Sequence, residues 1–232
     1  VKNVFVGLGA GAGCTTGDDN ICIGRDAGKG TDDADYNTAV GGRNQEGNNN
    51  GQNTTMGYGA GLSLTGTQNT FMGINASGEA TSGSNNLSLG KDAGRTGSPG
   101  GALGTGSNII QLGDDLISAS HIQTDWTVAS DQRDKTDFTA LDVGLDFVNA
   151  LKPVTYKWDK RSKYIDKGDP TVDLDKVTAD GTHKEDWLDI GFKAQEVEAL
   201  EKAAGYKIAD KTNLTTSITN DGKQYGIQYA KF

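Results

Sequence analysis

NICIG, at residues 20–24, belongs to a repeat that determines the fold of the first half of the chain. The other copies share the pattern Asn-x-x-x-Gly and are NVFVG at 3–7, NTAVG at 37–41, NTTMG at 53–57, NTFMG at 69–73 and NLSLG at 86–90. They follow one another at intervals of 16 or 17 residues. So regular a period is typical of stacked structures in which each repeat forms one coil.

Each copy has the pattern of a short β-strand. The residue before the glycine is always apolar, as in Ile23 and Val40, and the position two before it is often apolar too. Alternation of this kind predicts that these apolar side chains face the interior. The glycine ends the strand at a point where a turn needs positive φ or a close backbone approach. The asparagines start the strands and, if the coils stack, form a ladder.

The repeat therefore predicts a β-helix or β-roll-like shaft of 16–17-residue coils over residues 1–129. The motif weakens after residue 94, where Asn108 and Gly113 stand one residue too far apart. Three or four inward side chains per coil make a narrow core, which is hard to stabilise within one chain. We therefore expect three chains to share this core in a homotrimeric fibre.

The composition changes near residue 129. Most of the 34 glycines lie before this point, whereas most Lys and Arg residues lie after it. The net charge is −9 and both parts are acidic, so neither offers the basic face that binding to nucleic acid requires. No apolar run approaches the roughly 20 residues of a membrane span, and we expect no membrane insertion.

The two cysteines, Cys14 and Cys22, lie close together in the sequence but far from His121 and His183. We interpret them as two buried or half-buried free thiols in a protein made in a reducing cytosol, with a disulfide or metal site as the less favoured alternative. The sequence predicts no metal and no cofactor.

The second half has the signals of a compact α/β domain. A helix is predicted over 139–151, with an approximate capping box and a hydrophobic staple at its start and the apolar residues Leu141, Leu145, Val148 and Leu151 on one face. Strands are predicted over 154–158, 187–192 and 225–229, and a second helix over 193–205 with Ala194, Val197 and Leu200 inward. Residues 159–186 lack periodicity and indicate a long solvated loop, with a partner surface as the alternative.

Four motifs in this half carry a resemblance to a known family. They are Ser-Asp-x-Arg-x-Lys at 130–135, Leu-x-Pro-Val-x-Tyr at 151–156, Gly-Phe-x-Ala-Gln-Glu-Val at 191–197 and a closing tyrosine motif, YGIQY, at 225–229. Residues 130–232 resemble the intramolecular chaperone auto-processing domain found at the C-terminal end of phage tail fibres, neck appendages and endosialidase tailspikes. The Asn-x-x-x-Gly coils resemble the head repeats of trimeric autotransporter adhesins and phage fibre shafts.

The resemblance implies a single-turnover serine peptidase that cuts its own chain. The cut maps to the Ala129–Ser130 bond, with Ser130 as nucleophile and Lys135 as its basic partner. A serine hydroxyl is a poor nucleophile until a base removes its proton, and a lysine serves as that base when burial favours its neutral form. Two roles stay open for Asp131 and Arg133: a structural ion pair that shapes the turn, or support for Lys135 and the oxyanion. On spacing alone, a turn-capping serine and a solvated lysine are the favoured interpretation, and only the surrounding family motifs reverse that preference.

The resemblance also implies a biological setting. The domain would trimerise, guide folding of the upstream fibre, and then release itself, in a phage virion assembled in the bacterial cytoplasm. A host cell-surface glycan or protein receptor is then an expected partner. Family members usually continue into a helical tail, which we expect to be truncated or absent after Phe232. Two alternatives remain: a bacterial trimeric surface adhesin, and a tailspike depolymerase whose enzymatic domain lies upstream.

Overall fold

The computed structural model describes residues 2–30, 32–47, 50–123, 126–167, 169 and 172–231. By its internal contacts the chain forms two units, each of which is described by itself. The first unit contains residues 1–116, 158–185 and 218–224, and the second contains residues 117–157, 186–217 and 225–232.

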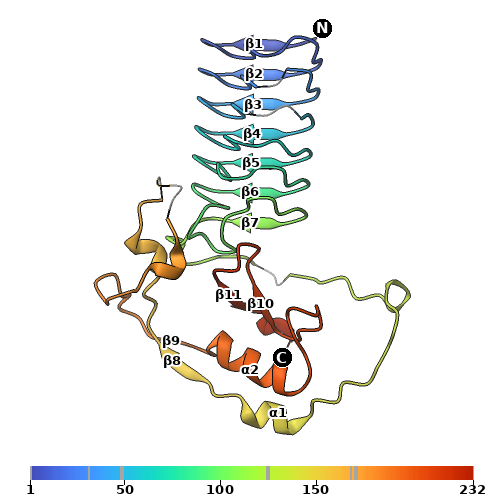
Figure 1. The fold of residues 1–232 in the computed structure, drawn as a ribbon, viewed down its shortest axis with the longest axis vertical. Helices are drawn as coiled ribbons and strands as arrows, with labels where there is room; N and C mark the ends of the chain where they lie inside the picture. The colour runs from blue at the N-terminus through green and yellow to red at the C-terminus, as the bar shows by residue number, and fades with distance from the viewer. Residues whose placement is uncertain are drawn as a thin grey trace. The chain divides into compact units, whose positions relative to one another are not determined.

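A β-solenoid forms most of the first unit (Figure 1). Its strands, as far as the chain is described, are β1 (Val4–Val6), β2 (Ile21–Ile23), β3 (Thr38–Val40), β4 (Thr54–Met56), β5 (Thr70–Met72), β6 (Leu87–Leu89) and β7 (Ile110–Leu112). Each strand pairs in parallel with the next, so the order in the sheet is the order in the chain. The predicted repetitive β fold of short stacked coils is therefore confirmed.

The direction of the strand side chains differs from the expectation. The central residue of each strand points inward, and Cys22, Ala39 and Phe71 at this position are fully buried. The flanking apolar residues point outward instead: Ile21 and Ile23 are 41% and 39% exposed. The prediction that the residue before each glycine faces the interior is therefore wrong, because the inward positions are occupied by the strand centre and by the asparagine two residues before that centre.

The asparagines form the predicted ladder inside the stack. Asn20, Asn37, Asn53, Asn69 and Asn86 are all buried. The side-chain oxygen of each accepts a hydrogen bond from the backbone N–H one coil further on, as from Asn37 to Asn20 at 2.9 Å and from Asn69 to Asn53 at 2.9 Å. At the last coil Ile109 donates its N–H to Asn86 at 3.0 Å and takes the asparagine's place. The ladder supplies every coil with hydrogen bonds that a narrow apolar core cannot provide.

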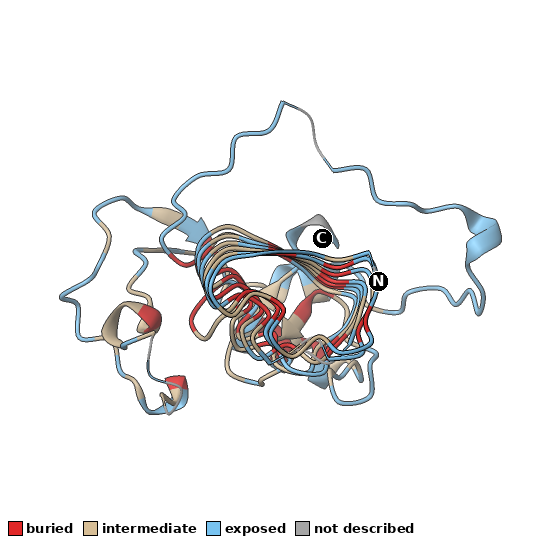
Figure 2. Cartoon of the chain, turned by 90° about the horizontal axis from the view of Figure 1, so that it is seen from above, coloured by how far each residue is buried: buried red, intermediate tan, exposed pale blue. Residues whose placement is uncertain are grey.

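The strand-ending glycines have the backbone that was predicted. Gly24 has φ +133°, and a Cβ built on it would lie 2.4 Å from the carbonyl oxygen of Gly41 in the next coil. Small and apolar residues fill the remaining interior, with Phe71 and Leu64 packed among Ala60, Ala76 and Leu103. Buried segments recur at the same place in successive coils when the stack is viewed from above (Figure 2).

Residues 158–185 pack on the solenoid, contrary to the prediction of a solvated loop. They contain the 3-10 helices η2 (Arg161–Tyr164) and η3 (Leu174–Lys176). Leu174 is 1% exposed, and the ring of Tyr164 meets that of His183 edge-on at 4.7 Å. The charged composition concealed this packing because the segment attaches through ion pairs and not through an apolar stripe.

In the second unit, the first helix is shorter than predicted. Helix α1 spans Leu145–Ala150, and Gly144, at its N-cap, has a non-helical backbone. The predicted capping box lies in an extended stretch, where Asp142 accepts a hydrogen bond from the Tyr206 hydroxyl at 2.5 Å. Leu145 and Val148 are 71% and 57% exposed, so no packed face extends the helix toward residue 139.

The remaining elements follow the prediction with shorter bounds. Strands β8 (Val154–Tyr156) and β9 (Asp189–Gly191) form an antiparallel pair, and β10 (Thr216–Ile218) pairs with β11 (Tyr225–Ile227). Helix α2 spans Ala194–Ala203. The 3-10 helix η4 (Tyr229–Lys231) follows β11. Val197 is buried as expected. Strand β10 was not predicted.

Candidate active site

The segment around Ser130 is extended and open to solvent. Its one regular element is the 3-10 helix η1 (Gln132–Asp134), and the Asp131 side chain caps it by accepting a hydrogen bond from the Arg133 N–H at 2.9 Å. Asp131 therefore plays the part of an N-cap residue, which turns the chain directly after the predicted cut.

This turn brings Ser130 and Lys135 together. The Lys135 Nζ donates a hydrogen bond to the Ser130 Oγ at 2.5 Å and a second, longer one to the Ser130 carbonyl oxygen at 3.3 Å. The predicted nucleophile and its predicted basic partner thus lie within proton-transfer distance, which is the first geometric requirement of a Ser–Lys dyad. Spacing in the sequence could not establish this contact.

Arg133 is engaged by Asp131 and not by the dyad. Its guanidinium approaches the carboxylate at 2.6 Å through Nη2 and 3.1 Å through Nε. These hydrogen bonds hold the pKa of the Asp131 carboxyl below its usual range and raise that of Arg133. Both residues are exposed, and in this arrangement the ion pair shapes the turn.

The surroundings of the dyad do not enclose it within one chain. Residues 126–141 are exposed without interruption. The apolar side chains among them are no exception, since Trp126, Val128 and Phe138 are 76%, 78% and 67% exposed. Ser130 and Lys135 are therefore in contact, but within one chain they lack the dry surroundings in which a nucleophile and its base act.

The three other motifs of the second half meet near Gly191. A Cβ built on Gly191 would lie 2.4 Å from the Tyr229 hydroxyl and 3.4 Å from the Tyr156 ring. The Tyr229 hydroxyl accepts a hydrogen bond from the Phe192 N–H at 3.2 Å, and the two rings stack at 6.2 Å. These residues hold β8, β9 and the chain end together, a structural role that sequence reasoning did not assign.

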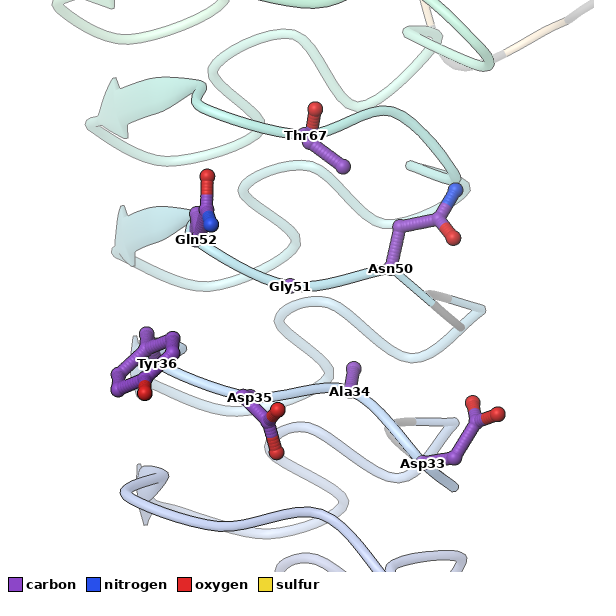
Figure 3. A pocket seen from close by; sticks show the side chains of 8 residues that line it. All are labelled: Asp33, Ala34, Asp35, Tyr36, Asn50, Gly51, Gln52 and Thr67. Atoms are coloured by element: carbon purple, nitrogen blue, oxygen red, sulfur yellow. The ribbon is translucent and has the colours of Figure 1, made fainter.

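A hollow lies on the side of the solenoid and spans neighbouring coils (Figure 3). It has a volume of about 520 Å³ and is lined by Asp33, Ala34, Asp35, Tyr36, Asn50, Gly51, Gln52 and Thr67. Tyr36 is 60% exposed and stands beside carboxylate and amide groups. An open aromatic ring next to such hydrogen-bonding groups is suited to a polar ligand with an apolar face.

The thiols are free, as predicted, with Cys22 buried and Cys14 half-buried. Burial raises the pKa of the Cys22 thiol to about 11. Across the described part of the chain, no three His, Cys, Asp or Glu side chains gather as metal ligands. No helix among the residues described is long and apolar enough to cross a membrane.

The fold and the site together define a β-solenoid followed by a small α/β unit that contains a Ser–Lys pair. Residues 130–206 match a peptidase family described as chaperone of endosialidase. The match begins at Ser130 itself, and it ends at Tyr206, so the resemblance of residues 207–232 stays a prediction. No curated protein and no solved structure matched the chain.

Proposed function

We propose that this chain is a segment of a bacteriophage tail fibre or appendage whose C-terminal part is a self-releasing intramolecular chaperone. The observation that carries the proposal is the 2.5 Å hydrogen bond between Lys135 and Ser130 at the first residues of the chaperone match. The stacked coils before it are the kind of β-structure whose non-local pairing is slow to nucleate. A domain that gathers the chains and fixes their register would speed this step.

The cleavage chemistry follows from the positions of the two groups. Lys135, in its neutral form, accepts the hydroxyl proton while Ser130 Oγ attacks the carbonyl carbon of Ala129. The C–N bond breaks as Lys135 passes this proton to the departing nitrogen, so that an ester joins Ala129 to the serine oxygen and the Ser130 amine is free. Water then hydrolyses the ester and releases a carboxylate at Ala129. Later loss of the chaperone would trap the fibre kinetically, because the barrier between its folded and unfolded states is higher once the factor that lowered it has gone.

Self-association into a homotrimer is the second part of the proposal. The chaperone unit leaves large apolar side chains such as Leu145, Trp187 and Ile190 exposed, each by more than half. The same unit has an open groove of about 340 Å³, lined by residues of α1, β8 and α2 and by neighbouring residues, with Leu151, Val154 and Leu200 among them. Apolar exposure of this extent in one chain is typical of an interface. Neighbouring copies would also enclose the Ser130 segment and so favour the neutral lysine that catalysis needs.

The test of cleavage compares the parent chain with Ser130→Ala and Lys135→Ala on denaturing gels, with N-terminal sequencing of the products. We expect two fragments from the parent, the second beginning at Ser130, and one intact band from each variant. Ser120→Ala, in the same exposed linker, is the matched control and should be cut normally. An intact parent that is nevertheless trimeric in solution contradicts self-cleavage.

Host attachment is the proposed role of the assembled fibre, and the hollow at Tyr36 is where we place a cell-surface glycan. Sugar rings combine an apolar face with hydroxyl groups, which fits a hollow lined by an exposed aromatic ring together with Asp33 and Gln52. Binding to a panel of bacterial surface glycans should be lost in Tyr36→Ala. Binding that persists in this variant would place the receptor site elsewhere, or upstream as in a tailspike depolymerase.

A bacterial surface adhesin is the alternative that the same solenoid would suit. It differs from the phage fibre in one measurable respect, since an adhesin has no use for release of its C-terminal domain. Stable full-length trimers whose band pattern does not change in Ser130→Ala would favour it.

A further inference from the structure

Two segments that follow the proposed cut belong to the same compact unit as the solenoid. They are the insertion, residues 158–185, and the hairpin tip, residues 218–224. Both lie on the C-terminal side of Ser130 in the sequence, so they would be part of the released chaperone. Their contacts with the last coils therefore decide whether cutting one peptide bond separates the two products.

The insertion pairs with two buried carboxylates at the end of the solenoid. Asp114 and Asp115 follow β7 directly and are only 6% and 4% exposed. The Lys167 ammonium contacts both, at 3.7 Å from Asp114 and at hydrogen-bond distance from Asp115. The Ser162 hydroxyl donates to the Asp115 carboxylate, and Lys160 donates to the Asp115 carbonyl at 2.8 Å. Removing the insertion would take away Lys167, the cation that pairs with both carboxylates.

The preceding coil makes a second set of contacts with the insertion. Arg95 donates to the backbone carbonyl of Lys167 at 2.5 Å and is itself held by Glu79 at 3.1 Å. A Cβ on Gly97 would lie 2.6 Å from the Cβ of Ser162, so the two backbones approach closely only because this residue is glycine. Residues of both the solenoid and the insertion therefore fit this contact.

The hairpin tip adds a third point of attachment. Asp221 lies against Gly101, and Asn220 lies against Gly106, where a Cβ on either glycine would fall within 3 Å of the side chain. The tip is tied to the insertion, since Arg161 donates to the Lys223 carbonyl at 2.6 Å. Lys223 also pairs with Asp173 at 3.2 Å.

We propose that the insertion and the hairpin tip form an end clamp that keeps residues 130–232 bound to the solenoid after the chain is cut, so that release of the chaperone is a separate step that follows cleavage. The partner surface is the end of the solenoid itself, at Asp114 and Asp115. Two attached segments hold more tightly than either alone because the second binds at high effective concentration. The clamp rests on the proposed function for the position of the cut, but its contacts do not involve Ser130.

The test severs the chain independently of self-cleavage. A recognition site for an added protease is inserted between Ser120 and His121, in the exposed linker, and Ser130→Ala removes any internal cut. The N-terminal piece carries an affinity tag, and the severed protein is washed at low and at high salt. We expect the C-terminal product to stay on the resin at low salt.

Lys167→Ala should reduce the retained fraction by about tenfold or more, because it leaves buried charges unpaired. Asp115→Asn, which preserves shape, should reduce it in the same direction. Lys176→Ala is the matched control, since Lys176 lies in the same insertion, is 83% exposed and pairs only with Asp173 among the described residues. Circular dichroism before cutting verifies that each variant is folded. Separation of the parent products at low salt overturns the clamp, as does undiminished retention of folded Lys167→Ala and Asp115→Asn. The parent chain, which keeps Ser130, could fail to cleave itself without changing the outcome of this test, because the added protease makes the cut.

Discussion

Single residues decide how closely one coil approaches the next. Gly24 combines a φ of +133° with a distance of 2.4 Å from a built Cβ to the Gly41 oxygen, and Gly41, Gly57 and Gly73 repeat this arrangement. Neither condition alone would demand glycine so strictly. The asparagine at the start of each strand and the glycine at its end are therefore one structural unit, which explains why they recur together.

Gly24→Ala is expected to lower the free energy of unfolding by about 1–3 kcal/mol from backbone strain, and by more because the backbone oxygen of Gly41 cannot move aside. Gly104→Ala separates the two effects. Gly104 has φ +51° but no atom within 4 Å of its built Cβ, so only the strain applies. Chemical denaturation of both variants measures the difference. Equal losses would mean that the close approach between coils contributes nothing.

Cys22 provides a pH-dependent test of the interior. Its thiol pKa is raised by burial from 9.0 to about 11, so the fold favours the neutral thiol. The corresponding stabilisation is present below pH 9 and is lost as the pH rises toward 11. A shift of this size leaves roughly 100-fold fewer thiolates at pH 8 than in the unfolded chain. Iodoacetamide at that pH should modify Cys22 only after unfolding, as followed by peptide mass analysis. Rapid labelling of Cys22 in the folded protein would contradict its burial.

At the scale of elements, α2 is joined to the following strand by one buried carboxylate. Glu201 is 1% exposed and accepts hydrogen bonds from Thr215, through its N–H and hydroxyl at 2.7 Å each. Thr216 donates its hydroxyl at 2.6 Å and its N–H at 3.1 Å. Burial by itself raises the pKa of Glu201, but these hydrogen bonds outweigh it and lower the pKa below its ordinary value.

Glu201→Gln should destabilise the contact between α2 and β10 by about 1–3 kcal/mol, because an amide nitrogen would face N–H donors. The stabilisation by the carboxylate is present above its unfolded pKa and is lost as the pH falls through the lowered folded value. Hydrogen exchange at Thr215 and Thr216 reports this locally. Glu196→Gln is the control, since Glu196 is exposed and pairs with Lys193 at the surface. Similar exchange in both variants would refute the role of Glu201.

The elements also show what the sequence could and could not predict. Period and strand positions were readable because every coil repeats the same local rule. Which face of each strand points inward could not be predicted. In so short a strand, apolar residues such as Ile21 and Ile23 lie on one face and Asn20 lies on the other, and the pattern alone does not decide which face is buried. In the candidate site, residue types at 130–135 were found from the motif, whereas the Ser130–Lys135 contact depends on a turn capped by Asp131. The packing of residues 158–185 was missed because its charges are paired across long sequence distances, as between Lys167 and Asp115.

At the scale of the whole molecule, the outward strand residues form an apolar stripe along the solenoid. Its exposed members include Val6 at 55%, Ile23 at 39%, Met56 at 42% and Leu112 at 50%. No charged side chain belongs to any of these strands. In a protein of net charge −9, a charge-free stripe on successive coils is where copies of the chain would approach each other at least electrostatic cost.

Replacing Ile23 and Met56 together by aspartate should weaken self-association at least about tenfold, since each buried apolar side chain contributes roughly 1.5–3 kcal/mol. Sedimentation velocity over a concentration series measures the change. Thr16→Asp adds one charge at an exposed position outside the strands and should leave association intact. If the stripe double variant associates like the parent, the contact between copies must lie elsewhere.

The asparagine ladder determines where coils could be added to the solenoid and where the series of coils ends. Every coil from Asn20 to Asn86 both donates to the coil before it and offers an oxygen to the coil after it, so coils are interchangeable parts. An extra repeat inserted between two of them would donate its asparagine N–H to the coil before it and accept an N–H from the coil after it. Ile109 does only half of this, because it donates its backbone N–H to Asn86 but has no side-chain oxygen that could accept a hydrogen bond from a further coil. The ladder therefore ends at Ile109, whereas the repeat before it sets no limit on the number of coils.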